Sequence, residues 1–208
     1  ENRELRCPNP ITQLIKNNPN SCKDAMKERS KMTTTHLIVM GVSGCGKSTV
    51  AQKIAENLGW SLAEGDDFHP EANIAKMSAG IPLTDEDRWP WLDLSVDGTK
   101  DRASVGHSTV VTCSALRRCY RDRLSAPPGK TVFVHLAADK DVLFARMIAR
   151  KDHFMPATLV DSQFATLEDL EPDEHGFVVD VDADIDTIVN TTMIELKQLG
   201  LIELPHNN

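Results

Sequence analysis

Eight consecutive residues constrain this chain more than any other feature. The run Gly41-Val42-Ser43-Gly44-Cys45-Gly46-Lys47-Ser48 fits the pattern G-x-x-x-x-G-K-[ST] in full. It follows the apolar run Leu37-Ile38-Val39-Met40, which is typical of a strand buried on both faces of a parallel sheet. It also opens a helix predicted over Lys47–Leu58, which ends at Gly59. A strand, a glycine-rich turn and a helix in this order predict a phosphate-binding loop.

The chemistry of phosphate binding explains these residue types. Glycines let backbone N–H groups close around phosphate oxygens, and the helix N-terminus adds the positive end of its dipole. Lys47 can bridge the β- and γ-phosphates of ATP, and the Ser48 hydroxyl can ligate Mg²⁺. The alternative is a turn that binds nothing, which the full match and its context disfavour. The predicted nucleotide-binding residues of this loop are Gly41, Ser43, Gly44, Cys45, Gly46, Lys47, Ser48 and Thr49.

Strand and helix candidates alternate after His36, which predicts an α/β fold with a parallel sheet and helices on both faces. Two segments interrupt this alternation. Residues 67–91 are polar and rich in proline, and residues 151–156 are short and charged. Both are predicted to be irregular segments that face a ligand. The further strand and helix candidates are Trp60–Ala63, Thr109–Cys113, Thr131–Leu136 and Phe177–Val181, and Arg117–Leu124, Asp141–Arg150 and Ile185–Leu199.

Length and composition favour one folded domain with a small appended segment. Residues 1–31 show no strong apolar period and precede Met32, so we expect an extension or an expression remnant before a domain at 32–208. The net charge of -8 argues against a nucleic-acid partner. The odd number of cysteines, five, disfavours a disulfide framework, and no apolar stretch is long enough to span a membrane. A cytoplasmic protein is therefore expected.

Acidic side chains follow the second predicted strand, in Glu64-Gly65-Asp66-Asp67. The carboxyl ends of parallel strands line the ligand crevice of such folds. Phosphoryl transfer to an alcohol needs a carboxylate that takes the hydroxyl proton and an acid near the metal. Alternate positions of an extended segment point to related sides, so Asp66 is the predicted base, and Glu64 joins Ser48 as a predicted metal residue. The alternative is a solvated acidic turn that caps the next helix.

These motifs, with the segments that follow them, resemble the gluconokinase family of shikimate-kinase-like P-loop kinases. The resemblance runs from about Leu37 to about Leu199, and in this family Asp usually occupies the position of Glu64. The matching text includes Gly65-Asp66-Asp67-Phe68-His69-Pro70, the segment from Gly80 to Arg88, Cys113-Ser114-Ala115-Leu116-Arg117-Arg118, Tyr120-Arg121-Asp122, His153-Phe154-Met155, Ser162-Gln163-Phe164 and Thr166-Leu167-Glu168.

The resemblance implies a fold and a reaction. The fold is a five-stranded parallel sheet with a substrate-binding insertion at 67–91 and a mobile lid at 151–156. The reaction transfers the γ-phosphoryl group of ATP, with Mg²⁺, to the terminal hydroxyl of D-gluconate. Its product, 6-phosphogluconate, feeds the pentose phosphate pathway. The family also suggests a homodimer.

A site for gluconate must pair a cation with several hydrogen-bonding groups. Arg88 can bind the carboxylate in a bidentate manner, unless it pairs with Asp85 on the surface. Lys76 can bind a hydroxyl of the substrate, unless it is simply solvated. Arg117 and Arg121 lie near the expected crevice but can instead decorate a helix. The full set of predicted substrate residues is Asp66, His69, Lys76, Asp87, Arg88, Ser114, Arg117 and Arg121.

Arg146 and Arg150 are one helical turn apart and share a helix face. By analogy with nucleoside monophosphate kinases, Arg146 is predicted to stack on adenine and Arg150 to contact the transferring phosphate as a catalytic residue, together with Asp66 and Lys47. The alternative is a basic helix end that complements the helix dipole. Two other functions stay open: a kinase for another small acid such as shikimate, or for a nucleotide, and a nucleotide-binding regulatory module without an acceptor site.

Overall fold

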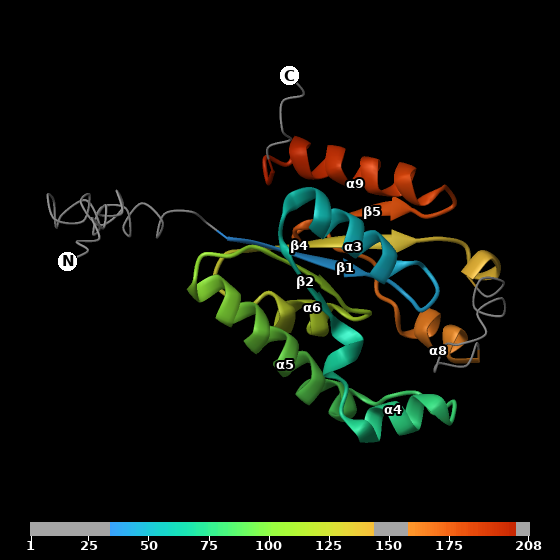
Figure 1. Ribbon diagram of the computed structural model, residues 1–208. Helices are drawn as coiled ribbons and strands as arrows, with labels where there is room; N and C mark the ends of the chain where they lie inside the picture. Colours follow the sequence, from blue (N-terminus) through green and yellow to red (C-terminus); the bar gives the residue numbers. More distant parts are fainter. Residues whose placement is uncertain (1–33, 144–157, 203–208) are drawn as a thin grey trace, which may run out of the picture. The chain divides into compact units, whose positions relative to one another are not determined.

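The computed structural model describes residues 34–143 and 158–202 (Figure 1). Five strands form one parallel sheet in the order β2-β3-β1-β4-β5. Their order confirms the predicted α/β fold and places the strand before the phosphate loop at the centre of the sheet. The strands are β1 (Thr35–Met40), β2 (Ser61–Glu64), β3 (Thr109–Thr112), β4 (Lys130–Ala137) and β5 (Gly176–Asp180).

Helices cover both faces of this sheet (Figure 1). The side chains of β1 alternate between them: Leu37 and Val39 pack with α3 and α9, whereas Ile38 and Met40 pack with α5 and α6. This alternation explains why the strand reads as an unbroken apolar run. The helices are α3 (Lys47–Leu58), the 3₁₀ helix η1 (Gly65–Phe68), α4 (Glu71–Ser78), α5 (Asp85–Ser104), α6 (Arg118–Leu124), α8 (Thr158–Thr166) and α9 (Ile185–Gln198).

The segment 67–91 is largely helical, so the prediction of an irregular insertion is wrong. It contains the end of η1, all of α4 and the first residues of α5. Thr84 and Asp87 form a capping box that starts α5 despite the proline-rich approach. Pro90 lies in the second turn, where it costs the helix one hydrogen bond without ending it. The turn-forming residues therefore mark helix boundaries rather than a long loop.

Several predicted features lie outside the described residues. These are the extension 1–31, the lid 151–156, and both Arg146 and Arg150. Residues 140–143 are helical, and the rest of the helix predicted over 141–150 lies outside the described residues. In the ranges 34–143 and 158–202, no helix combines the length and the apolar character that crossing a bilayer requires. The division of the chain at Met32 and the role of the lid stay predictions.

Candidate active site

The phosphate loop connects the end of β1 to the start of α3. Gly41, Gly44 and Gly46 have φ angles of 132°, 88° and 91°, which side chains rarely adopt. At Gly41 a Cβ atom would also lie 2.5 Å from the carbonyl oxygen of Leu136. Gly46 is the N-cap of α3 and carries no side chain that could accept from the first N–H groups of the helix. The N-terminus of α3, with Ser48 and Thr49 exposed, is therefore open toward an anion.

The side chains of Lys47 and Gln163 contact the backbone of this loop. The Lys47 ammonium donates to the carbonyls of Gly41 and Val42 at 3.1 and 3.2 Å, so it folds over the loop that it follows. From α8, the side-chain carbonyl of Gln163 accepts a hydrogen bond from the Ser43 N–H at 2.7 Å. Ser114, which follows β3, joins the loop through its carbonyl, which accepts from the Gly41 N–H at 3.3 Å. The loop is thus held from α8 and from the end of β3.

The backbone at Gly65 separates two carboxylates at the end of β2. Its N–H donates to the Thr112 hydroxyl at 3.0 Å, and its carbonyl accepts from the Trp91 indole at 2.6 Å. A Cβ atom here would lie 2.0 Å from the carbonyl oxygen of Thr112, which leaves no space for a side chain. The chain turns into η1 at this point, so the predicted extended geometry for Glu64 and Asp66 is wrong. The two carboxylates flank a buried glycine instead of sharing one side of a strand.

Glu64 meets the phosphate loop through Ser48. The Ser48 hydroxyl donates to Glu64 Oε2 at 3.0 Å, and the Thr112 hydroxyl donates to the same oxygen at 2.7 Å. A hydroxyl and a carboxylate in contact at a phosphate-binding helix suit Mg²⁺, which uses few protein ligands and keeps waters and phosphate oxygens in its shell. No group of three or more metal-ligating His, Cys, Asp or Glu side chains occurs in the described part of the chain. The donor set therefore fits a metal that is held jointly with a nucleotide.

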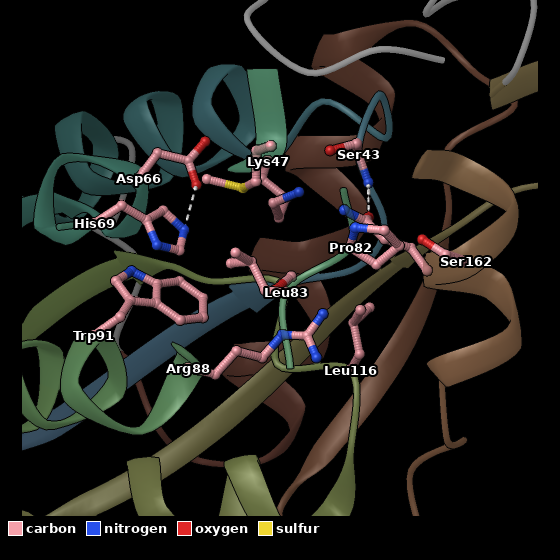
Figure 2. Close-up of a pocket in the computed structure, with 13 residues that line it drawn as sticks. Ser43, Lys47, Asp66, His69, Pro82, Leu83, Arg88, Trp91, Leu116 and Ser162 are labelled. Atoms are coloured by element: carbon pink, nitrogen blue, oxygen red, sulfur yellow. Dashed lines mark hydrogen bonds and ion pairs between the residues drawn. The ribbon is translucent and has the colours of Figure 1, made fainter. Parts of the chain in front are cut away.

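A cavity next to the loop collects several predicted site residues (Figure 2). Lys47 and Asp66 lie along one side of it, and the guanidinium of Arg88 points into it from the opposite side. His69 and Ser114 also line it, as predicted for residues of one site. It thus joins an ammonium next to the phosphate loop, an exposed carboxylate and a second cation. The other lining residues are Ser43, Met77, Pro82, Leu83, Trp91, Leu116, Ser162 and Gln163.

His69 packs against the floor of this cavity. Its ring stacks on Trp91 with 4.2 Å between centroids, and its Nε2 lies 4.0 Å from Asp66 Oδ1. Burial lowers the pKa of His69, while Asp66 acts in the opposite direction and Arg88 adds to the lowering. The lowered pKa favours the neutral imidazole, which can donate one hydrogen bond and accept another. Trp91 is buried, and it also contributes to the cavity wall.

Arg88 does not pair with Asp85, which was its alternative role. Asp85 instead accepts hydrogen bonds from the Tyr120 hydroxyl and from Arg117 at 2.5 and 2.6 Å. Arg88 donates to the Tyr120 oxygen at 3.1 Å. Arg117 also contacts Glu168 at 3.5 Å and is absent from the cavity lining. Of the two arginines, Arg88 is the one that the structure places at the cavity.

Lys76 and Asp87 form an ion pair at the edge of α4 and α5. The ammonium lies 2.6 and 2.8 Å from the two carboxylate oxygens, so Lys76 is not simply solvated. The hydrogen bond from Lys76 lowers the pKa of Asp87, and bonds from Thr84 add to this effect. Neither side chain lines the cavity. Both were predicted to bind hydroxyls, and their pairing connects the two helices next to the site.

Arg121 points away from the cavity, in contrast to its predicted role in substrate binding. Its side chain is 0% exposed and makes an ion pair of 2.6 Å with Glu174, whose side chain is 4% exposed. The guanidinium also donates to four backbone carbonyls, those of Ala115, Leu116, Glu168 and Asp169. These bonds account for its donors, because guanidinium N–H groups buried without partners are costly. We therefore leave Arg121 out of the site.

Ser162 and Gln163 are site residues to which sequence reasoning assigned no role. Both belong to α8 and line the cavity, and Gln163 contacts the loop across 120 residues of chain. The only signal was their presence in the motif Ser162-Gln163-Phe164, which carries the family resemblance. The apolar lining residues Pro82 and Leu83 also lie in a matching segment, that from Gly80 to Arg88, but no role was predicted for them.

Comparisons with known proteins agree with this arrangement. The AAA domain family matches residues 37–170. A gluconokinase of Gluconobacter oxydans (strain 621H) is 52% identical over 132 residues, which are 64% of this chain and 74% of that protein. A solved sugar kinase from a Janibacter species shares 48% identity with a TM-score of 0.76 and covers 81% of this chain and 95% of its own. A solved gluconokinase from Sinorhizobium meliloti 1021 shares 44% identity with a TM-score of 0.72, at the same coverage.

The parallel sheet, the complete phosphate loop and the adjoining cavity define a P-loop kinase. Such a kinase uses ATP as its phosphoryl donor. Given its extended identity to the bacterial relatives, the chain belongs to the gluconokinase family.

Proposed function

We propose that the protein transfers the γ-phosphoryl group of ATP to the terminal hydroxyl of D-gluconate, giving 6-phosphogluconate and ADP. One observation carries this proposal: Lys47 at the phosphate loop, Asp66 and Arg88 line one cavity. A single small acid in this cavity can therefore contact a phosphate-binding lysine, a carboxylate that takes a proton and an arginine that binds its carboxylate. The relatives from Gluconobacter oxydans and Sinorhizobium meliloti, both named gluconokinases, support the choice of acid.

The chain's own residues divide the chemistry between them. The N–H groups of the phosphate loop and the start of α3 bind the phosphates of ATP. Lys47 moves from its loop carbonyls to the β- and γ-phosphates, where its charge stabilises the transition state. Asp66 accepts the proton of the acceptor hydroxyl as the oxygen bonds to the γ-phosphorus. The bond from that phosphorus to the bridging oxygen breaks, and ADP leaves.

Mg²⁺ is the metal that we assign to Ser48 and Glu64. Bound there, it would supply positive charge to the phosphate oxygens. Glu64 is already oriented by the hydroxyls of Ser48 and Thr112, so its carboxylate needs little rearrangement. The longer side chain of Glu64, compared with the usual Asp, keeps the negative charge that this role needs.

Arg88 is the proposed ligand of the gluconate carboxylate, because a guanidinium binds a carboxylate through two parallel hydrogen bonds. His69 and Ser114 line the same cavity and are proposed to bind hydroxyls. The ion pair of Lys76 and Asp87 is proposed to hold α4 and α5 beside the substrate. Roles for Arg146 and Arg150, a homodimer and a cytoplasmic location stay predictions.

A coupled assay with a panel of acceptors tests this function. Purified protein is supplied with ATP, Mg²⁺ and one acceptor: D-gluconate, shikimate, a nucleoside monophosphate or none. We expect ADP release that depends on gluconate, with a kcat/KM at least ~100-fold above that for the other acceptors. Faster turnover with shikimate or a nucleotide would replace gluconate as substrate. Slow ADP release that no acceptor stimulates would point to a regulatory module.

A further inference from the structure

A buried tyrosine fixes the arginine that faces the acceptor cavity. Arg88 Nη1 donates a hydrogen bond to Tyr120 Oη at 3.1 Å. Tyr120 is 0% exposed, so its phenol is held by the surrounding packing. The guanidinium carbon of Arg88 also lies 5.5 Å from the centre of the Tyr120 ring, within range of cation–π attraction. Two different contacts from one rigid side chain therefore orient Arg88.

Asp85 sets the direction of this hydrogen-bond chain. The Tyr120 hydroxyl donates to Asp85 Oδ1 at 2.5 Å, so its proton points to Asp85 and its lone pairs are left to accept from Arg88. Burial raises the pKa of Tyr120, and the bond to Asp85 raises it further. The bond from Tyr120 in turn lowers the pKa of Asp85. At neutral pH the phenol is thus protonated and the carboxylate is ionised.

The charges of the cluster leave Arg88 available to an anion. Arg117 lies 2.6 Å from Asp85 and 3.5 Å from Glu168, so two carboxylates neutralise its charge. Arg88 bonds to the neutral phenol instead. Across residues 34–143 and 158–202, the ion pairs of this cluster go to Arg117. The network therefore keeps a second cation in place without cancelling its charge.

Helices α5 and α6 bring Asp85, Arg88 and Tyr120 together. Asp85 and Arg88 are three residues apart in the first turns of α5, so they share one face of that helix. Tyr120 lies in α6, which packs against α5. The Tyr120 ring also meets Trp89 edge to face, with 5.4 Å between centroids. Its position thus depends on packing as well as on its hydroxyl, which allows the two contributions to be separated by mutation.

We propose that Tyr120 and Asp85 are positioning residues that orient Arg88 toward the carboxylate of the acid substrate. The proposal rests on the proposed function, since it assigns that carboxylate to Arg88. An unsupported arginine samples many rotamers and loses this freedom when it binds a ligand. In this protein the side chain is oriented before the acid arrives. The network should therefore affect the binding of the acid more than the chemical step.

The Tyr120→Phe variant removes the hydroxyl and keeps the ring that packs on Trp89. We expect the KM for gluconate to rise about ten-fold, because hydrogen bonds to charged groups are the stronger ones. The KM for ATP and the kcat should stay within about two-fold of the wild type. Asp122→Asn, on the same helix but paired with Arg118, is the matched control and should leave all three constants unchanged.

A neutral acceptor distinguishes a role in orienting Arg88 from a general structural defect of the site. D-glucitol has the hydroxyls of gluconate but lacks its carboxylate, so it gains nothing from Arg88. The ratio of kcat/KM for gluconate to that for D-glucitol should fall about ten-fold in Tyr120→Phe. A merely structural defect would lower both values together and leave the ratio unchanged, which would overturn the proposal.

The Asp85→Asn variant is the second test, and it tests the positioning role if Tyr120→Phe does not fold. It removes the charge that directs the Tyr120 proton, and it should raise the KM for gluconate in the same direction. If both folded variants keep the wild-type KM, the positioning role is wrong. If the wild-type protein itself does not phosphorylate gluconate, the proposed function fails instead. The two failures are thus distinguishable in one set of assays.

Discussion

The side-chain carbonyl of Gln163 in α8 accepts a hydrogen bond of 2.7 Å from the backbone N–H of Ser43 in the phosphate loop. This contact joins the phosphate loop to a helix whose residue lies 120 positions later in the chain. An uncharged acceptor can hold the loop without repelling phosphate, whereas a carboxylate cannot. The chemical nature of residue 163 should therefore affect the reaction separately from its hydrogen bond.

Two substitutions at Gln163 test this. Gln163→Leu removes the acceptor and should lower kcat/KM for ATP about five-fold, in line with one hydrogen bond of about 1 kcal/mol. Gln163→Glu keeps an acceptor but adds negative charge beside the phosphates, so it should cost more than Gln163→Leu in steady-state kinetics. Wild-type kinetics for Gln163→Glu would contradict the prediction.

Asp66→Asn should remove the proposed general base while it keeps the shape of the side chain. We expect kcat to fall by about 10²- to 10⁴-fold, because the amide cannot take the hydroxyl proton. The affinity for ATP, measured by calorimetry, should stay within about three-fold. Asp67→Asn, the exposed neighbour in the same 3₁₀ helix, is the control and should be nearly as active as the wild type. Unaltered turnover in Asp66→Asn would reject Asp66 as the base.

Glu64→Gln should weaken the proposed magnesium site. A carboxamide can still accept from Ser48 and Thr112, but it is a poorer ligand for a hard cation. The Mg²⁺ concentration that gives half-maximal activity at fixed ATP should rise about ten-fold or more. Glu64→Asp, which restores the usual residue of the family, should stay close to the wild type. Equal magnesium dependence in both variants would argue against Glu64.

Arg121→Met should destabilise the fold rather than impair the site. It leaves Glu174 buried without its partner, and such a loss typically costs about 3–5 kcal/mol of unfolding free energy. The double variant Arg121→Met, Glu174→Met should recover part of this loss. Arg123→Met, which breaks an exposed pair with Asp93, should cost about 1 kcal/mol or less. Urea denaturation measures all three, and a small loss for Arg121→Met would be inconsistent with its buried network.

Stability should fall as the pH drops below about 6.5. Burial lowers the pKa of His36, His69 and His135, so over this range the unfolded chain binds more protons than the folded protein. The lowered pKa of carboxyls such as Asp85 matters only in more acidic solution. Urea denaturation between pH 7.5 and 5.5 therefore isolates the histidines. His135→Leu removes one of these groups and should flatten the dependence.

Local sequence patterns predicted the phosphate loop and the strands of the parallel sheet. The loop of Gly41–Ser48 and the apolar runs of the strands depend on neighbouring residues, which are visible in the sequence. The sequence did not predict the helix that begins at Asp85, because Pro82 and Pro90 are typical of loops, whereas the hydrogen bonds between Thr84 and Asp87 start it. Here a local signal outweighed two turn formers.

Side-chain roles that depend on distant partners could not be read from the sequence. Arg121 looked like a site residue because it follows β3 in the chain, yet Glu174 and four carbonyls hold it in the interior. Gln163 had no visible partner until the fold brought it to Ser43. In both cases the decisive contact spans tens of residues or more, and a single sequence carries no record of it.

The absence of a side chain at Gly65 has a consequence for the whole reaction. A Cβ atom at Gly65 would lie only 2.0 Å from the carbonyl oxygen of Thr112. Only glycine fits here, so the backbone between Glu64 and Asp66 keeps the same conformation. The side chain before it can lengthen or shorten, as Glu64 does, while the residue after it keeps its place. The backbone, and not either acid, therefore sets the separation between the proposed metal residue and the proposed base.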